Sequence, residues 1–305
     1  MKLTFTTQVL AAVAIAAVSV SIAAATTATN APTTPTGPTT PTSFKVNIVG
    51  KGQPMILIPG LASSGEVWDS TVKQFCEGSR YECHVLTLAG FAGVEPIAAP
   101  LLPTVATQLI DYINTKKMHR PIMVGHSLGG FLVLRLAIDY PDKFGRLIIV
   151  DSLPALGAVQ MPDATPEQLK SMATRMLESM KAQDKTAAAE GHKKSIASMV
   201  TQPEDVERIL GWSSKSDPNT IFSAMHDLIA TDLRQDIARI KSPTLVLGTW
   251  IAYKDYAPRA AIEATYKTQY QKLSGVTIEL ADNARHFIMY DDPKWMFERM
   301  ENFFK

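Results

Sequence analysis

Cysteine and net charge are both scarce in this chain of 305 residues. It has only two cysteines, and its six histidines show neither His-Glu-x-x-His nor paired Cys-x-x-Cys spacing, so the sequence predicts no bound metal and no cofactor. The formal net charge is +1, which offers no excess of basic residues to attract phosphates. We therefore expect no nucleic-acid partner.

The N-terminus has the pattern of an export signal. Lys2 precedes an uncharged run rich in alanine, valine and isoleucine at 9–25, which ends in three alanines. We expect a signal peptide at 1–25, cleaved near Ala25 or, as a second option, at Ala31. An uncleaved anchor is the alternative, although the run is shorter than the roughly 20 residues that a spanning helix prefers. The predicted location is periplasmic or secreted, without stable membrane insertion after cleavage.

Residues 26–43 are rich in threonine and proline and have too little apolar surface to fold, which predicts a disordered linker. Export also affects the interpretation of Cys76 and Cys83, because an oxidising compartment favours a disulfide between the only two cysteines. Closing so short a loop would contribute roughly 2–3 kcal/mol. A redox-active pair is the alternative.

The remaining chain, 44–305, has the composition of a globular domain, since the whole sequence is 46% hydrophobic and 19% charged. Strand-like runs alternate with segments of helical spacing, which predicts a largely parallel sheet that binds ligands at the carboxyl ends of its strands. No convincing strand appears over about 155–236, where apolar residues recur at helical spacing, so this stretch reads as a helical insertion. The predicted strands are 44–49, 55–58, 84–88, 121–124, 146–151, 243–248 and 276–280.

The sequence Gly-His-Ser-Leu-Gly-Gly at 125–130 lies between an apolar strand and a helix-like segment. A Gly-x-Ser-x-Gly turn in that place is so tight that the serine takes a strained conformation, which exposes its hydroxyl for attack. Isolated matches to this pattern are common, and an ordinary strand-to-helix turn is the plain alternative. The context favours Ser127 as a nucleophile.

Four pieces in this order resemble the α/β-hydrolase superfamily, in particular its esterase and haloperoxidase-like members with a helical cap. They are Leu-Ile-Pro-Gly-Leu at 57–61, the serine motif, the segment 232–245 that leaves the insertion, and His-Phe-Ile-Met at 286–289 with Asp-Pro at 292–293. The resemblance covers about 44–305. It implies an α/β-hydrolase fold with a mostly parallel sheet of the eight-stranded type and a cap at about 155–236.

The resemblance makes His286 the base for Ser127, because it follows the last predicted strand. His126 is interpreted as part of the packing of the turn. The acid that orients His286 is less clear. Asp255 is the preferred residue, because the family usually places the acid after the strand at 243–248, but the gap is longer than the family pattern. Asp151, at the end of the preceding strand, is the alternative. The third option is that neither aspartate is the acid.

By the family's geometry, the backbone N–H groups of Leu61 and Leu128 would stabilise the negative charge that develops on the substrate oxygen. The family usually has histidine before glycine where this chain has Pro59, which removes a side chain that often braces the loop.

The expected activity is cleavage of a small or medium apolar carboxylic ester. Methionines of the insertion would form an adaptable pocket or simply a helix core, and three tryptophans are candidate pocket walls. These residues are Met161, Met172, Met176, Met180, Met199, Met225, Trp68, Trp212 and Trp250. An amidase, a lactonase or a cofactor-free perhydrolase would use the same triad, and a binding protein on the same fold is the rival from another class. The sequence does not specify the oligomeric state.

Overall fold

The computed structural model describes residues 42–98 and 100–305. The predicted signal peptide and nearly all of the predicted linker lie outside these residues. Within the described part of the chain, seven strands form one sheet in the order β1-β3-β2-β4-β5-β6-β7. The strands are β1 (Phe44–Gly50), β2 (Gln53–Ile58), β3 (Tyr81–Leu88), β4 (Ile122–His126), β5 (Leu147–Val150), β6 (Thr244–Thr249) and β7 (Thr277–Ala281). They match the seven strands that the sequence predicts.

All neighbouring strands are parallel except β1, which pairs antiparallel with β3. Apolar residues alternate between the two faces of β2, with Ile56 and Ile58 in one buried cluster and Met55 and Leu57 in the other. Both faces of the sheet are therefore covered, as expected for parallel strands.

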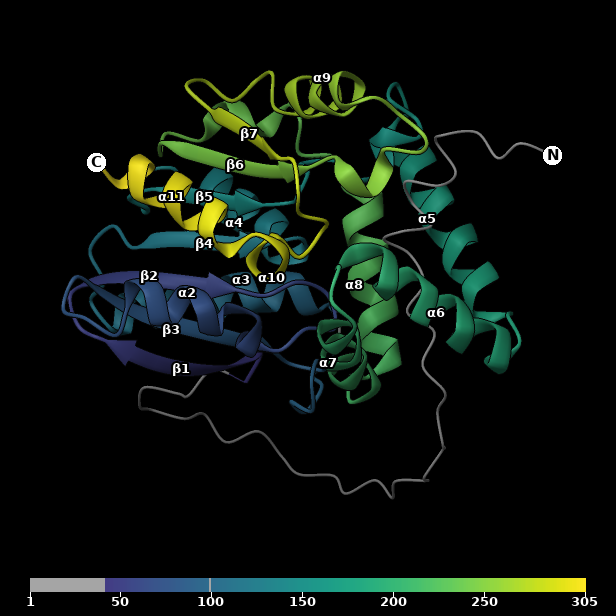
Figure 1. The fold of residues 1–305 in the computed structure, drawn as a ribbon, viewed down its shortest axis with the longest axis horizontal. Helices are drawn as coiled ribbons and strands as arrows, with labels where there is room; N and C mark the ends of the chain where they lie inside the picture. Colours follow the sequence, from purple (N-terminus) through teal and green to yellow (C-terminus); the bar gives the residue numbers. More distant parts are fainter. Residues whose placement is uncertain (1–41, 99) are drawn as a thin grey trace.

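Helices cover both faces of the sheet (Figure 1). One face carries α3 (Leu101–Thr115), α4 (Leu128–Asp139) and α9 (Arg259–Gln269), and the other carries α2 (Asp69–Phe75) and α11 (Pro293–Phe304). The short elements are η1 (Gly65–Trp68), η2 (Gly157–Val159), η3 (Asp236–Arg239), η4 (Ile251–Tyr253) and α10 (Ile288–Asp291). The Ser64 side chain caps η1 by accepting a hydrogen bond from the Glu66 N–H.

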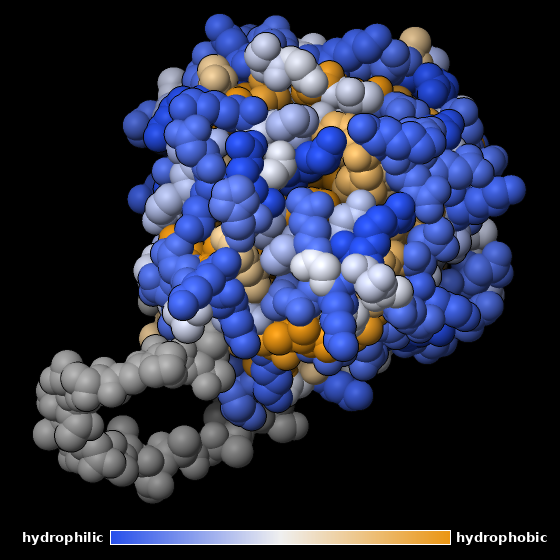
Figure 2. Space-filling model, turned by 90° about the vertical axis from the view of Figure 1, so that its left-hand side faces the viewer, coloured by the Kyte–Doolittle hydropathy of each residue, from blue (hydrophilic) through white to orange (hydrophobic). Residues whose placement is uncertain are grey.

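Four helices fill the insertion between β5 and β6 and form a cap: α5 (Pro166–Lys181), α6 (Lys185–Met199), α7 (Pro203–Ser214) and α8 (Pro218–Ala230). They lie beyond the carboxyl ends of the parallel strands (Figure 1). Side chains cap three of these helices, with Thr165, Asp184 and Asp217 each accepting backbone N–H bonds. The side of the molecule away from the cap is largely hydrophilic, with apolar residues in small separate patches (Figure 2).

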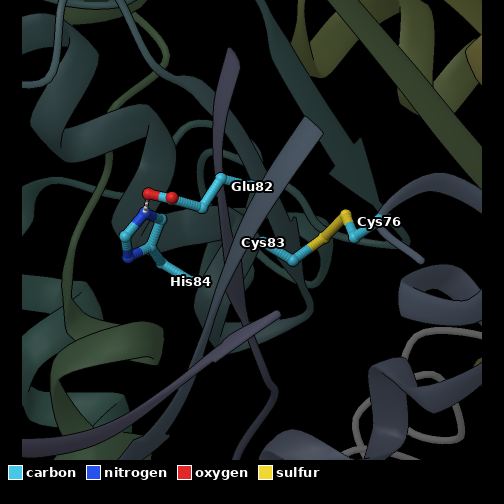
Figure 3. The surroundings of a disulfide bond; sticks show 4 residues. All are labelled: Cys76, Glu82, Cys83 and His84. Atoms are coloured by element: carbon cyan, nitrogen blue, oxygen red, sulfur yellow. Dashed lines mark hydrogen bonds and ion pairs between the residues drawn. A yellow bond between two sulfur atoms is a disulfide. The ribbon is translucent and has the colours of Figure 1, made fainter. Parts of the chain in front are cut away.

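A disulfide joins Cys76, at the end of α2, to Cys83 in β3, which confirms the predicted pairing. Their Cα atoms are 5.8 Å apart, an ordinary separation for a disulfide. Side chains alternate along β3, so Cys83 points to one side of the strand while Glu82 and His84 point to the other (Figure 3).

Candidate active site

Ser127 occupies the turn between β4 and α4. Its φ of +51° and ψ of −117° lie in a region that residues with a side chain rarely adopt. The turn is held in place because the Ser127 N–H donates to the Val150 carbonyl at 2.9 Å. The serine is half-buried and faces a pocket beneath the cap.

The tight turn requires a glycine at position 125. A Cβ atom there would fall on the carbonyl of Gly129, in the first turn of α4. Strand and helix therefore approach each other so closely that only glycine fits, which is the physical basis of the motif found in the sequence.

His286 and Asp151 form a buried pair beside Ser127. The Nδ1 atom of His286 lies 2.6 Å from Oδ2 of Asp151, and the two side chains are 15% and 6% exposed. A carboxylate can only accept, so Nδ1 donates and the neutral ring keeps the lone pair on Nε2. His286 is thus in the tautomer that a general base needs.

Both predicted oxyanion donors lie next to the nucleophile. Leu128 is the first residue of α4, and the first N–H groups of a helix have no acceptor within that helix. Leu61 follows β2, whose end pairs with β4 at Gly125, and it lines the same pocket as Ser127. The two backbone segments that flank Ser127 are therefore those that the sequence indicates.

Two adjoining pockets meet at Ser127 and His286, and Leu228 of α8 lines both. The first holds about 590 Å³ of empty space, part of it open to solvent, between the loop that carries Leu61 and the cap. Eight of its sixteen lining residues have apolar side chains, and the others are serines, histidines and one glycine. The second holds about 490 Å³ beside Asp151, and Tyr253 and Tyr266 line it. A substrate held here would contact the sheet on one side and the cap on the other.

The sequence model that describes the Alpha/beta hydrolase family matches residues 55–299 of this chain. The chain belongs to that family. A pimeloyl-[acyl-carrier protein] methyl ester esterase of Nitrosomonas europaea is 26% identical over 212 residues, which cover 67% of this chain and 79% of the relative. The enzyme of the same name from Aeromonas salmonicida is 27% identical over 253 residues, which cover 79% and 92%.

Solved structures share the fold of this hydrolase. An esterase from Exiguobacterium antarcticum superposes with a TM-score of 0.67 at 16% identity, covering 85% of this chain and 94% of that one. A bromoperoxidase from Bacillus anthracis gives a TM-score of 0.68 at 18% identity, covering 86% and 95%. Both predictions, the α/β-hydrolase fold and a hydrolytic enzyme, are confirmed.

The prediction that prefers Asp255 as the partner of His286 is wrong. The carboxylate that accepts from His286 belongs to Asp151, the alternative. After β6 the chain turns through η4 and a further turn, which carries Asp255 to the exposed surface. Asp151 follows β5 directly and has a φ of +44°, so its side chain remains at the edge of the sheet.

His126 links the serine turn to the loop that carries His286. Its Nε2 donates to the His286 carbonyl at 3.0 Å, and the two ring centroids are 4.5 Å apart. Burial lowers the pKa of His126 well below its usual value, and the neighbouring His286 lowers it further. His126 is therefore a neutral, packed residue, in agreement with the interpretation of the sequence.

Hydrogen bonds join the cap to the loop that carries His286. The Phe287 N–H donates to the Met199 carbonyl at 3.1 Å, and the Arg285 guanidinium donates to the Ala197 carbonyl at 2.7 Å. In return, the Thr201 N–H donates to the Asp291 carboxylate at 2.8 Å. Sequence reasoning missed these contacts, because no local pattern connects the end of α6 with a loop almost ninety residues later.

Only two of the predicted pocket residues, Met199 and Met225, line the first pocket. Leu177 and Met180 are buried in the main hydrophobic core, against which Met172 and Met176 pack. Neither of the two pockets includes a tryptophan: Trp68 is fully buried against His126, Trp212 donates to Glu66, and Trp250 donates to Asp282. Residues 42–98 and 100–305 contain no cluster of three potential metal ligands, and none of their helices is long and apolar enough to cross a membrane.

Proposed function

We propose that this protein is an exported serine hydrolase that cleaves a carboxylic ester of a small or medium apolar substrate. One observation carries the proposal: Ser127, in a strained turn, shares a pocket with His286, whose Nδ1 donates to Asp151. Such an arrangement supplies a nucleophile, a base in the right tautomer and a charge that stabilises the base once it is protonated.

The reaction would run in two steps. Nε2 of His286 takes the proton of Ser127 as the hydroxyl oxygen attacks the ester carbonyl carbon. The oxygen of the tetrahedral intermediate would accept bonds from the N–H groups of Leu61 and Leu128, each contributing roughly 3–4 kcal/mol. Collapse of the intermediate breaks the ester bond, and His286 returns the proton to the departing alcohol. Water then attacks the acyl-enzyme by the same route.

The pockets support an apolar substrate of modest size. Apart from the catalytic groups, the first is walled mainly by aliphatic and aromatic side chains. Burying apolar substrate surface there would supply the binding free energy, at about 25 cal/mol per Å². The esterase activity of the two relatives, which by their names act on a methyl ester of an acyl group on a carrier protein, agrees with this class.

Covalent labelling tests the proposed nucleophile. A fluorophosphonate probe should add one label to the wild-type protein at Ser127, and Ser127→Ala should abolish labelling and lower kcat on p-nitrophenyl butyrate by about 10⁵-fold or more. Ser195→Ala is the matched control, because it removes another hydroxyl that lines the same pocket, and the label should remain.

The labelling experiment also separates the alternatives. A folded wild-type protein that takes no label would overturn the proposal in favour of a ligand-binding role. The protein could instead take the label and hydrolyse amides or lactones, or form peracids, without cleaving esters of any chain length. That result would retain the nucleophile and reject the substrate class.

Export can be tested on the full chain. Cells that express it should release a mature protein from the periplasm or the medium, and its N-terminal sequence should begin at Thr26, or at Pro32 if cleavage follows Ala31. Recovery of the intact chain from the membrane fraction would show an uncleaved anchor. Recovery of the intact chain from the cytoplasm would refute export.

A further inference from the structure

The second oxygen of the Asp151 carboxylate has its own buried donors. While Oδ2 accepts from His286, Oδ1 accepts from the Thr249 N–H at 3.1 Å and from the Tyr266 hydroxyl. Tyr266 belongs to α9 and is 6% exposed. The carboxylate is therefore held from both sides, whereas a single bond would leave it able to rotate about its Cβ–Cγ bond.

A missing side chain in β6 lets Tyr266 reach this position. A Cβ atom at Gly248 would lie 2.5 Å from Cζ of the Tyr266 ring and 2.8 Å from one of its Cε atoms. Both distances are shorter than any ordinary carbon contact, so the ring can lie across the end of β6 only because residue 248 is glycine.

The hydroxyl of Tyr266 can only act as a donor here. Burial raises the pKa of Tyr266 well above its usual value, and the negative charge of Asp151 raises it further. The phenol therefore stays protonated throughout the pH range in which a serine hydrolase works, and its proton points at a carboxylate oxygen.

We propose that Tyr266 is a positioning residue of the active site, which fixes the orientation of the Asp151 carboxylate toward His286. This inference rests on the proposed function, since it assumes that His286 is the base. It also gives a reason why the acid can stand at the end of β5: α9 supplies a hydroxyl that holds it there.

The Tyr266 hydroxyl should also weaken the electrostatic effect of the Asp151 carboxylate on His286. A hydrogen bond to Oδ1 stabilises the negative carboxylate, so its removal leaves that charge more available to a protonated imidazole. Protonated His286 is then favoured, and the base is inactive up to a higher pH. A role confined to packing would not produce this shift.

Tyr266→Phe tests the proposal, because it removes the oxygen and retains the ring. We expect kcat on p-nitrophenyl butyrate to fall about tenfold with KM nearly unchanged. The acid limb of the kcat/KM profile should move to higher pH by about half a unit. The measurement is steady-state kinetics from about pH 5 to 9, with the thermal midpoint of each variant as a check on folding.

Tyr270→Phe is the matched control. Tyr270 is buried one turn further along, and its hydroxyl donates at 2.8 Å to the Ser152 carbonyl rather than to Asp151. This variant should lose a comparable amount of thermal stability and leave the acid limb in place. If the two variants have the same kcat and the same acid limb, Tyr266 has only a structural role and the proposal is wrong.

A second variant approaches the same contact from the other side. Gly248→Ala retains the hydroxyl but pushes the ring away from Asp151, so the acid limb should move in the same direction as in Tyr266→Phe. An unshifted limb in a folded Gly248→Ala protein would contradict the proposal. Wild-type protein that neither labels nor turns over esters would instead overturn the proposed function itself.

Discussion

At the scale of single residues, the carboxylate of Asp151 is the most constrained polar group of the site. Three donors from separate parts of the chain converge on its two oxygens: His286, Thr249 and Tyr266. A buried carboxylate is costly unless it is hydrogen-bonded, and here every bond also orients it. The same contacts that offset the cost of burial therefore also orient His286, the proposed base.

Replacing Asp151 by Asn should test its role as the acid. The amide has nearly the same shape but can present an N–H to Nδ1, which favours the wrong tautomer of His286, so kcat should fall about 10⁴-fold. Asp255→Asn is the matched control, because Asp255 is exposed and it should change kcat by no more than about twofold. The measurement is the rate of p-nitrophenyl butyrate hydrolysis. Equal losses in the two variants would contradict this assignment.

At the scale of elements, the strands and the serine turn could be predicted from the sequence because their signals are local. The run of apolar residues before 125–130 indicates a buried strand, and the glycine spacing indicates the turn. Both follow from contacts between residues close in the chain.

The acid could not be predicted in this way, because its position depends on three elements that meet only in the folded chain. Asp151 follows β5, Thr249 ends β6, and Tyr266 lies in α9, more than a hundred residues after Asp151. One local hint is the long segment between β6 and α9, where the chain forms η4 and carries no carboxylate soon after the strand. Gly248 adds a second hint, since a glycine inside an apolar strand indicates a close approach.

The disulfide is a structural bond between two elements, α2 and β3, rather than a redox site. Both cysteines are completely buried, which denies access to a partner thiol. Cys83 lies near the beginning of β3, and β3 runs parallel to β2, whose far end leads to the oxyanion loop. The bond therefore ties α2 to the sheet at the end away from the site.

At the scale of the whole molecule, the cap and the sheet domain share the active site. The loop that carries His286 is bonded to the end of α6, and α7 is joined to η1 because Trp212 donates to Glu66 at 3.0 Å. Two sides of the pocket are thus held by hydrogen bonds between cap and sheet domain. The stability of the whole fold therefore also preserves the geometry of the site.

Two buried histidines should make that stability depend on pH. Burial lowers the pKa of His126 and of His84, although a hydrogen bond from His84 to Glu82 partly opposes the shift in the latter. Their usual value in an unfolded chain is 6.5. Below that pH the unfolded chain takes up protons that the folded protein does not, so their stabilising contribution is complete above about pH 6.5 and declines as the pH falls.

The free energy of unfolding should therefore fall between pH 6.5 and 5.5, by about 1 kcal/mol for each histidine that stays neutral in the folded state. His84→Gln should reduce this slope, because glutamine does not titrate, whereas His119→Gln, which replaces an exposed histidine, should leave the slope unchanged. Urea unfolding at several pH values measures it. A slope in His84→Gln equal to that of the wild type would mean that His84 has the same pKa in the folded and the unfolded chain, and would contradict this prediction.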